Sequence, residues 1–490
     1  MQSGTATPQE TPGIPTNGGL FAAGFADLNH EVSVERLPVQ GRFPEWLTGT
    51  LLRTAPCKYD LGRQTVSHWF DGLAMLHKFS FAGGQVSYAN RFLHSDEFQG
   101  ATKTGGVTSH AFATDPCGSL FRRVLSKFFP KWTDNSNVNI TSFANQMVAL
   151  TETRLPVRFD PETLETLGHY PINPEIKGLI SIAHPHYDSD RKCLFSYLLN
   201  FGLKSRYRLF KIDNQSGAQS VVAELAIDRP AYMHSFGMSS RHLVLVEFPL
   251  VVNPLSFVFR FQPFIRNYHW RPERGLRFHV FEKDGGRCVK TVEAEAVFAF
   301  HHINAFERGD ELVVDFVAHR DAGVIDQLYL SRLRAGEPTD AVGRPMRYRI
   351  PLGSSSQVRS EPLSDTRMEL PRIDYARAAG QPYRTIWGAG NHRPGNFIDS
   401  IVRVDVETGQ ALEWSEEGVY PGEPVFVAKP DANGEDVGVL LSVVLDARRN
   451  RSFLLVLDAV SLAEIARAEC PHHIPLGFHG NYFPARGPQA

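Results

Sequence analysis

A short motif recurs four times along this chain, and its spacing constrains the fold more than any other feature. Each copy has an apolar residue, Asp, two variable residues, and Ser or Thr followed by Leu or Gly; the aspartates are Asp160, Asp213, Asp405 and Asp458. Asp160 and Asp213 lie 53 residues apart, and so do Asp405 and Asp458. Aspartate with a hydroxyl three residues later commonly opens a turn between antiparallel strands. A period near fifty residues therefore predicts the blades of a β-propeller, each a four-stranded sheet.

Short runs of β-branched, leucine and aromatic residues recur through the chain, whereas long helical periodicity is scarce. This pattern is typical of all-β proteins. The runs at 437–445 and 453–457 flank a charged turn and predict an antiparallel hairpin. Closed all-β architectures can be long as one unit, so we expect a single propeller domain over residues 19–490. Residues 1–18, rich in Gly, Pro, Thr and Gln, predict a disordered lead-in.

Charge and cysteine content exclude several classes of protein. The formal net charge of −2, with both signs interspersed, argues against a nucleic-acid-binding surface. The five cysteines are scattered without a Cys-x-x-Cys pair, so neither a disulfide framework nor a thiolate zinc site is predicted. These features favour a cytoplasmic location. We expect neither a signal peptide nor a membrane-spanning helix, because no run has the required charge and hydropathy.

Four histidines lie in apolar or aromatic surroundings, where an imidazole is costly to bury without a partner. They are His184 (in Ala-His-Pro-His), His234 (in Tyr-Met-His-Ser-Phe-Gly), His301 (in Phe-Ala-Phe-His-His-Ile-Asn) and His479 (in Phe-His-Gly). Three of them follow a repeated aspartate by 21 to 24 residues, which is about one strand and a connection. If that position is the innermost strand of a blade, the side chains converge on the propeller axis and can share one metal ion.

Imidazole donors suit Fe, Zn, Cu or Ni, and the residues alone do not select among these metals. The alternative is that each histidine is a hydrogen-bonded core residue, as we expect for His186, His302, His472 and His473. Glutamates in apolar contexts fit acceptors for the second N–H of metal-bound imidazoles. The alternative for these glutamates is an exposed edge strand or turn. They are Glu152, Glu369 and Glu423.

In these segments the chain resembles the carotenoid cleavage oxygenases, most of all the branch that holds the animal β-carotene oxygenases and the retinoid isomerase of the retinal pigment epithelium. The resemblance runs from about Leu37 to Phe483. The segments that carry it are 41–53 (Gly-Arg-Phe-Pro-Glu-Trp-Leu-Thr-Gly-Thr-Leu-Leu-Arg), 70–79 (Phe-Asp-Gly-Leu-Ala-Met-Leu-His-Lys-Phe), 133–139 (Thr-Asp-Asn-Ser-Asn-Val-Asn), 183–186, 233–236, 300–304, 423–427 and 478–480.

The resemblance implies a seven-bladed propeller with a dome of helices and loops over an axial ferrous ion. Four histidines match the family's iron ligands: His184, His234, His301 and His479. His301 is preferred to its neighbour because the first histidine of that pair is the family's ligand. Three glutamates match family residues that hydrogen-bond the ligands at 234, 301 and 479, in an order the sequence does not give: Glu152, Glu369 and Glu423. Val138 matches a position near an open coordination site of the iron.

The implied function is that of an Fe(II) dioxygenase. It would cleave a conjugated C=C bond of a carotenoid or apocarotenoid with O₂, giving aldehydes such as retinal. One rival is a stilbene-cleaving oxygenase, whose members tend to bind the phenolate with Tyr and Lys; 91–95 and 139–148 contain neither residue. A second rival is non-oxidative ester cleavage with isomerisation, as in the retinoid isomerase. A third, from another class, is a propeller that serves only as a binding scaffold.

Two segments are candidates for membrane contact. Residues 115–130 and 251–270 combine Phe, Leu and Val with basic side chains at a spacing that fits interfacial helices. The alternative is that these helices pack against the core. Cys117 resembles a palmitoylated cysteine of the vertebrate isomerase. We therefore expect a cytoplasmic enzyme that associates peripherally with membranes to extract a lipophilic substrate.

Overall fold

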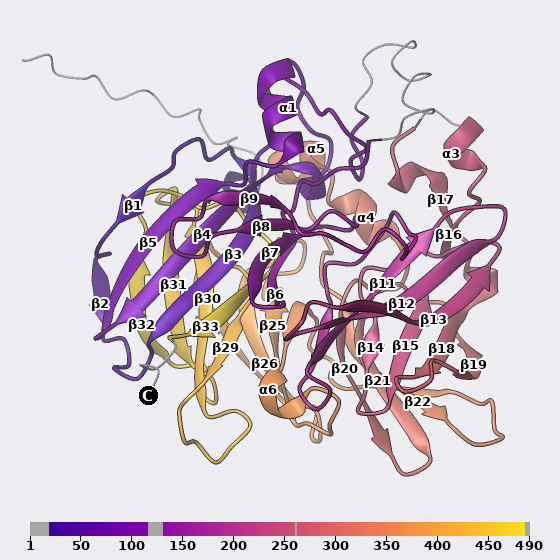
Figure 1. Ribbon diagram of the computed structural model, residues 1–490. Helices are drawn as coiled ribbons and strands as arrows, with labels where there is room; N and C mark the ends of the chain where they lie inside the picture. Colours follow the sequence, from indigo (N-terminus) through magenta and orange to yellow (C-terminus); the bar gives the residue numbers. More distant parts are fainter. Residues whose placement is uncertain (1–18, 116–130, 260–261, 486–490) are drawn as a thin grey trace, which may run out of the picture.

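Seven antiparallel β-sheets form a β-propeller, as the spacing of the aspartate motif predicts (Figure 1). The computed structural model describes residues 19–115, 131–259 and 262–485. The predicted lead-in at 1–18 lies outside the described residues. So do residues 116–130, which contain Cys117 and nearly all of the first predicted membrane segment.

Five blades have four strands, paired in chain order. They contain β6 (Asn139–Phe143), β7 (Gln146–Leu150), β8 (Val157–Phe159) and β9 (Thr166–His169); β10 (His186–Asp188), β11 (Cys193–Asn200), β12 (Ser205–Asp213) and β13 (Gln219–Ile227); β14 (Gly237–Met238), β15 (His242–Glu247), β18 (Leu276–Glu282) and β19 (Cys288–Ala294); β20 (His302–Arg308), β21 (Glu311–Ala318), β22 (Arg344–Pro351) and β23 (Arg359–Pro362); and β24 (Met368–Arg372), β25 (Thr385–Gly390), β26 (Ser400–Asp405) and β27 (Ala411–Ser415). The fourth strand of each blade is its most exposed, so the first strand faces the middle of the molecule.

The two remaining blades join the beginning of the chain to its later part. One contains β1 (Ser33–Val34), β5 (Gln85–Phe92), β4 (Leu73–Ala82), β3 (Gly49–Lys58) and β33 (Gly480–Pro484). The other contains β2 (Val39–Gly41), β32 (Glu464–Glu469), β31 (Arg451–Asp458), β30 (Gly438–Asp446), β28 (Val419–Pro421) and β29 (Val425–Ala428). Because β33 pairs with β3 and β2 pairs with β32, two antiparallel ladders close the ring and leave no gap between first and last blades.

The repeated aspartate opens the turn from the third to the fourth strand of a blade, which confirms the prediction. Asp458 is typical: its Oδ1 accepts hydrogen bonds from the backbone N–H of Val460 and of Ser461 at 3.1 and 2.8 Å, and from the Ser461 hydroxyl at 2.7 Å. Asp213 makes the same three contacts with the residues two and three positions later. The predicted hairpin is also confirmed, because β30 and β31 pair in antiparallel fashion.

Short helices and a two-stranded sheet lie beyond one end of the blades, at the top of Figure 1. These elements are α1 (Asp96–Thr104), α3 (Ser256–Phe259), α4 (Gly323–Gln327), α5 (Leu330–Arg334), β16 (Leu250–Val252) and β17 (Tyr268–Trp270). The helix α6 (Tyr375–Ala378) lies toward the opposite end, and the 3₁₀ turns are η1 (Leu20–Phe25), η2 (Trp69–Asp71), η3 (Ile265–Asn267) and η4 (Pro272–Arg274). The helix α1 starts at Ser95, whose hydroxyl accepts from the Phe98 N–H, and ends at Gly105 in the left-handed region.

The second predicted membrane segment, 251–270, is not the interfacial helix that its spacing suggests. It contains β16, the four-residue helix α3 and β17, and the two strands pair with each other. Phe264 is buried and stacks on Phe257, with ring centroids 5.6 Å apart. Leu255 and Phe259 are 48% and 73% exposed. The aromatic residues therefore divide between core and surface, which a pattern of residue types cannot show. Among the described residues, no helix has the length and apolar character needed to cross a bilayer.

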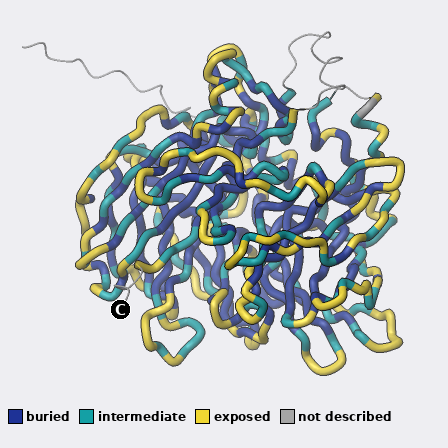
Figure 2. The backbone as a smooth tube through the Cα atoms, in the orientation of Figure 1, coloured by how far each residue is buried: buried dark blue, intermediate teal, exposed yellow. Residues whose placement is uncertain are grey.

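The core lies inside and between the blades, and the exposed residues lie mainly in turns, outer strands and the short helices (Figure 2). The largest cluster of buried side chains spans several blades and the loops above them, and it includes Trp69, Phe298, Phe300 and Phe478. The aromatic part of this cluster lies next to the histidines, so the packing that holds the blades together also encloses the candidate site.

Candidate metal centre

The four predicted histidines belong to four different blades and lie just before the innermost strand of each. His184 precedes β10, His234 precedes β14, His301 precedes β20 and His479 precedes β33. Because the innermost strand of each blade lies next to the propeller axis, the residue at its start also lies near that axis. The predicted equivalence of His184, His234 and His479 is confirmed, and His301 shares their position. They lie at the start of the innermost strand rather than within it.

The four imidazoles meet in one cluster. Nε2 of His184 lies 3.1 Å from Nε2 of His234, and Nε2 of His301 lies 3.0 Å from Nε2 of His479. The potential ligand atoms of all four residues lie within 4.8 Å of one another. Three of the side chains are buried, and that of His184 is partly buried. This spacing is that of donors around a single ion.

Each of the three predicted glutamates binds one histidine, and the structure resolves the pairing that the sequence left open. Nδ1 of His234 donates to Glu152 at 2.5 Å, and Nδ1 of His301 donates to Glu369 at 2.5 Å. Nδ1 of His479 donates to Glu423 at 2.7 Å. None of these glutamates binds His184.

This hydrogen bonding shows that the cluster fits a cation. A neutral imidazole carries one N–H, and in His301 and His479 that hydrogen is committed to a carboxylate at Nδ1. Their Nε2 atoms therefore both present lone pairs, and the 3.0 Å contact between them is repulsive rather than a hydrogen bond. The Nε2 of His234 also presents a lone pair, because the hydrogen of this imidazole is committed to Glu152 at Nδ1. A divalent metal ion converts this repulsion into coordination, and neutral imidazole nitrogens are suitable ligands for Fe, Zn, Cu or Ni.

Burial keeps the imidazoles of His184 and His479 neutral, and neighbouring cationic and imidazole groups keep Glu369 and Glu423 ionised. Burial lowers the pKa of His479 to about 4, and burial and the neighbouring imidazoles hold the pKa of His184 well below its usual value. Burial by itself would raise the pKa of Glu423, but Arg372 and His479 outweigh it and lower this pKa to about 2. The pKa of Glu369 is likewise lowered, by His301 and His319 against burial. Metal-binding protonation states thus prevail at neutral pH.

A further layer of partners was not predicted from the sequence. The Tyr232 hydroxyl donates to Glu152 at 2.7 Å, and Nε2 of His319 donates to Glu369 at 2.8 Å. Arg372 binds both carboxylate oxygens of Glu423, at 2.8 and 2.9 Å. Tyr232 lies in the segment around His234 and could have been considered. His319 and Arg372 have no local signal, because only the fold brings them to their glutamates.

Two histidines that were expected to be core residues behave as such. The Ser235 hydroxyl lies 2.7 Å from Nδ1 of His302, so the second imidazole of the His-His pair points away from the cluster. His186 contacts the Phe236 carbonyl at 2.8 Å through Nε2 and the Tyr375 hydroxyl at 2.9 Å through Nδ1. His302 begins β20 and His301 directly precedes it, and successive side chains of an extended segment point to opposite sides, which separates the two imidazoles.

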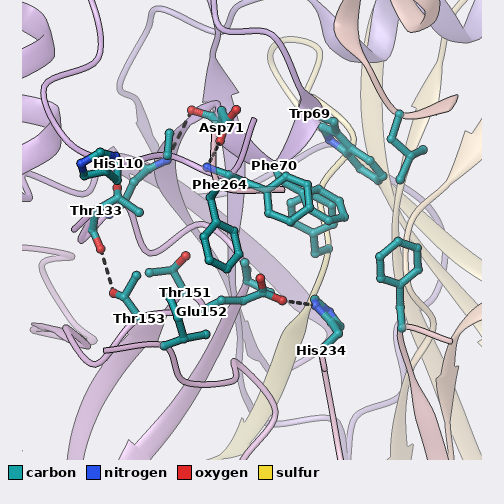
Figure 3. A pocket seen from close by; sticks show the side chains of 18 of the residues that line it. Trp69, Phe70, Asp71, His110, Thr133, Thr151, Glu152, Thr153, His234 and Phe264 are labelled. Carbon is teal, nitrogen blue, oxygen red and sulfur yellow. Dashed lines mark hydrogen bonds and ion pairs between the residues drawn. The ribbon is translucent and has the colours of Figure 1, made fainter. Parts of the chain in front are cut away.

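A cavity opens beside the histidines on the side of the dome (Figure 3). The space between its walls, including the part open to solvent, is about 1080 Å³, and the walls are mostly apolar and aromatic. His234, His301, Glu152 and Glu369 are among its lining residues, and so is the buried Val138. The cavity therefore places an apolar, aromatic surface directly beside the imidazole cluster.

A buried carboxylate supports one wall of the cavity. Asp71 accepts hydrogen bonds from the backbone N–H of Phe112 and of Ala113, at 2.8 and 3.0 Å, and from the Thr114 hydroxyl at 2.6 Å. Burial raises the pKa of Asp71 to about 6 although these three donors oppose the shift. The loop at 112–114 thus depends on a carboxylate that titrates near neutrality.

Known proteins match the chain over nearly its full length. The family described as retinal pigment epithelial membrane protein matches residues 25–484. The mitochondrial carotenoid-cleaving dioxygenase of Macaca fascicularis is 34% identical, over 91% of this chain and 91% of that protein. The beta,beta-carotene 15,15'-dioxygenase of Gallus gallus is 30% identical, over 91% of this chain and 95% of that protein.

A solved structure shares the fold. The crystal structure of the cobalt-substituted Synechocystis apocarotenoid oxygenase superposes with a TM-score of 0.83 and 25% sequence identity. The alignment covers 95% of this chain and 98% of the other.

Proposed function

Because this chain belongs to the retinal pigment epithelial membrane protein family, which includes the carotenoid-cleaving dioxygenases, we propose that it cleaves a conjugated C=C bond of a carotenoid or apocarotenoid with O₂ and forms aldehydes. Retinal is one such product. The observation that carries the proposal is the convergence of four imidazoles beside an apolar cavity, with three of them oriented by glutamates. We further propose that residues 19–490 act as one catalytic domain.

The proposed metal is Fe(II), held by Nε2 of the four histidines. Neutral imidazoles leave the ion its full positive charge, and four ligands leave positions open for other molecules. The bound iron would supply activation of O₂ beside the alkene. These ligands are His184, His234, His301 and His479.

The protein's own residues fix the geometry of that reaction. Glu152, Glu369 and Glu423 hold the imidazole rings so that each Nε2 points at the same place, which a loosely held ligand would not achieve. Phe300 packs edge-on against the His234 ring, with centroids 5.5 Å apart, and keeps this side of the site dry. Val138 occupies a lining position, and we propose that its small apolar side chain limits access to an open coordination position.

The cavity supplies binding and orientation. Its aromatic lining gives a polyene a large apolar contact area at low entropic cost, and holds the double bond near the imidazole cluster. The rival in which the propeller is only a scaffold leaves the converging lone pairs of His301 and His479 without a reason. Stilbene cleavage and non-oxidative isomerisation remain as outcomes of the tests below.

We propose peripheral membrane contact through α3 and its surroundings. Leu255 and Phe259 expose apolar side chains close to Phe257, which stacks on the cavity residue Phe264. Replacing both exposed residues by Ser should reduce sedimentation with phospholipid vesicles. If the double variant sediments with the vesicles as much as the wild-type protein does, the proposed contact is wrong. A matched control is the exposed pair Leu412→Ser and Val460→Ser. The cytoplasmic location stays a prediction, and the name of the Macaca relative places that protein in mitochondria.

Product analysis tests the proposed reaction. The protein, reconstituted with Fe(II) without oxygen and then exposed to air, is incubated with β-carotene, with apocarotenals and with a stilbene. We expect two carbonyl products from a polyene, identified by mass. Cleavage of the stilbene alone would support the stilbene oxygenase, and an isomerised alcohol from a retinyl ester would support the isomerase.

Iron content tests the ligand set. His301→Ala should bind no iron and lose turnover while its circular dichroism is unchanged. His302→Ala is the matched control, because its imidazole points to Ser235, and it should keep its iron. Turnover in the first variant would show the ligand choice to be wrong. A wild-type protein that takes up no iron on anaerobic reconstitution would favour the scaffold.

A further inference from the structure

A single strand, β24, holds two of the four imidazoles in place. Its residue Glu369 accepts a hydrogen bond from Nδ1 of His301 at 2.5 Å. Arg372, three residues later, donates to both oxygens of Glu423 at 2.8 and 2.9 Å, and Glu423 in turn binds Nδ1 of His479. The Nε2 atoms of the two imidazoles lie 3.0 Å apart. The backbone of β24 therefore sets the positions of two neighbouring ligands.

A regular strand would not direct both side chains to these partners. Successive side chains of a strand alternate between its two sides, so residues three positions apart face opposite ways. In β24, however, Glu369 pairs with Ala389 of β25, and Arg372 pairs with Trp387. The chain advances by three residues in β24 and by only two in β25, which is the excess of one residue that defines a β-bulge. The extra residue brings Glu369 and Arg372 to the same side.

The bulge contains a backbone conformation that is unusual for a strand. Leu370 has a φ of +50°, in the left-handed region that residues other than glycine seldom adopt. Within the described ranges, the other non-glycine residues with a positive φ all lie in turns or loops, whereas Leu370 lies inside a strand. A conformation of this kind persists only where its surroundings impose it, and bulges are frequent next to functional sites.

Two contacts stabilise this bulge. The backbone N–H of Leu370 donates to Oε2 of Glu369 at 2.8 Å, the same oxygen that contacts His301. On β25, Gly388 lies between the two paired residues and therefore opposite Leu370 and Pro371. A Cβ atom at Gly388 would lie 3.1 Å from the carbonyl oxygen of Glu369, so glycine leaves room for the extra residue. Pro371 has no N–H, and the bulge therefore leaves no ladder donor unpaired there.

We propose that Leu370 is a positioning residue of the metal centre. Its left-handed backbone places Glu369 and Arg372 on one side of β24. Through these two residues it fixes the imidazole of His301 relative to that of His479. This inference rests on the proposed function, since it assigns a role toward the ion that the four histidines would hold.

The branching of the side chain tests the proposal. Leucine and isoleucine are isomers, but a branched Cβ is strongly disfavoured at a positive φ, although it is favoured elsewhere in strands. Leu370→Ile should lower the affinity for Co(II) about tenfold, measured without O₂ by competition with a chelator. The visible absorption bands of the bound Co(II) should also shift, because they respond to ligand geometry. Leu370→Met, which is unbranched, should bind Co(II) as the wild-type protein does.

Leu462 provides the matched control. It is also buried, has a φ of +56°, and lies in the turn between β31 and β32, which contains no ligand of the metal centre and no partner of one. Leu462→Ile should lower the melting temperature and leave the affinity and the spectrum of Co(II) unchanged. If Leu462→Ile weakens Co(II) binding as much as Leu370→Ile does, the effect reports general destabilisation and the proposal is wrong. It is also wrong if Leu370→Ile and Leu370→Met bind Co(II) alike.

Two further variants test the bulge if Leu370→Ile does not fold or if its effect needs a second route. Gly388→Ala crowds the bulge from the partner strand, and it should weaken Co(II) binding and shift the spectrum. Unchanged binding would contradict the proposal. In a Glu369→Gln background, Leu370→Ile should cost less affinity than it does in the wild-type protein, because both changes act on the same imidazole. A full additional loss would show that the bulge does not act through Glu369.

These measurements use neither O₂ nor a polyene, so they separate this inference from the proposed reaction. If the variants bind Co(II) as expected but the iron-loaded wild-type protein cleaves no polyene, the proposed reaction fails and the role of Leu370 stands. If a polyene is cleaved but Leu370→Ile and Gly388→Ala bind Co(II) as the wild type does, only the role of Leu370 fails. A wild-type protein that takes up no divalent metal would contradict both.

Discussion

At the scale of single residues, the metal-centre histidines could be found from sequence because their surroundings are unusual. An imidazole between aromatic residues needs compensation, and this holds for His234, His301 and His479. The partners of these imidazoles could be named but not assigned. The three hydrogen-bonded pairs join residues 82, 68 and 56 positions apart, and nothing local specifies which pairs form.

The shared role of Glu369 gives a first residue-level prediction. Its two carboxylate oxygens accept from His301 and from His319. Glu369→Gln replaces one acceptor by an NH₂ group, so one imidazole must lose its partner or turn around. We expect metal affinity to fall about 10- to 100-fold, measured by competition with a chelator. Glu361→Gln, an exposed residue paired with Arg349, is the control. Equal affinities in the two variants would refute the orienting role.

Asp71 gives a pH dependence. Its pKa in the folded protein, about 6, is above the ordinary value of an aspartate, so the folded state takes up a proton that the unfolded chain does not. Its contribution to stability is therefore full below the unfolded pKa and is lost as the pH rises through about 6. Protonation also removes an acceptor site needed by the loop at 112–114, so we expect kcat/KM to fall below about pH 6.

Asp71→Asn isolates this effect, because it removes the titration and keeps the shape. Its kcat/KM should be lower than that of the wild type near pH 7.5 and should lack the step near pH 6. The pH profiles of both proteins, measured with the same iron content, provide the comparison. A step of the same size in the variant would assign the titration to another group.

At the scale of elements, the strand-ending motif was the most reliable signal, because its physics is local. The Asp458 carboxylate satisfies three donors within three residues. The prediction of an interfacial helix at 251–270 was wrong because the structure of this segment is set by contacts that are distant in sequence. The structure of this segment depends on the pairing of β16 with β17 and on the packing of Phe264 in the cavity wall. The spacing of Phe and Arg in the sequence indicates neither.

The turn motif can be tested directly. Asp458→Ala leaves the N–H of Val460 and of Ser461 without their side-chain acceptor, and we expect a loss of about 1–2 kcal/mol in unfolding free energy. Thermal or denaturant unfolding, followed by circular dichroism, measures this loss. Asp310→Ala is the control, because Asp310 is an exposed turn residue whose carboxylate makes no hydrogen bond with the described residues. If Asp310→Ala lowers the unfolding free energy by as much as Asp458→Ala, the hydrogen bonds of the motif do not stabilise the protein more than an ordinary turn residue does.

At the scale of the whole molecule, the sequence period predicted the architecture, whereas the number of blades came from the family resemblance. Only four copies of the aspartate motif are recognisable, but seven blades are present. The remaining blades use other turns, so a count of motifs would have been too low. The closing ladders between β3 and β33 and between β2 and β32 involve strands more than four hundred residues apart and have no sequence signature.

The distribution of the ligands predicts that metal stabilises the entire propeller. Since four blades each contribute one imidazole, a bound ion links them, and metal binds the folded state alone. With free metal at a hundredfold excess over its Kd, we expect the melting temperature to rise by about 3 °C. The measurement compares chelator-treated protein with protein reconstituted anaerobically. His184→Ala should show no metal-dependent rise, and a rise of wild-type size would place the metal elsewhere.

One consequence of the ring closure concerns the order of synthesis. His479 stands directly before β33, and β33 completes the first blade by pairing with β3. During translation, three of the four histidines are therefore synthesised long before the fourth. The blade that positions the fourth is completed last. A growing chain cannot assemble the full set of donors, so we expect coordination by all four imidazoles only after the last blade has closed.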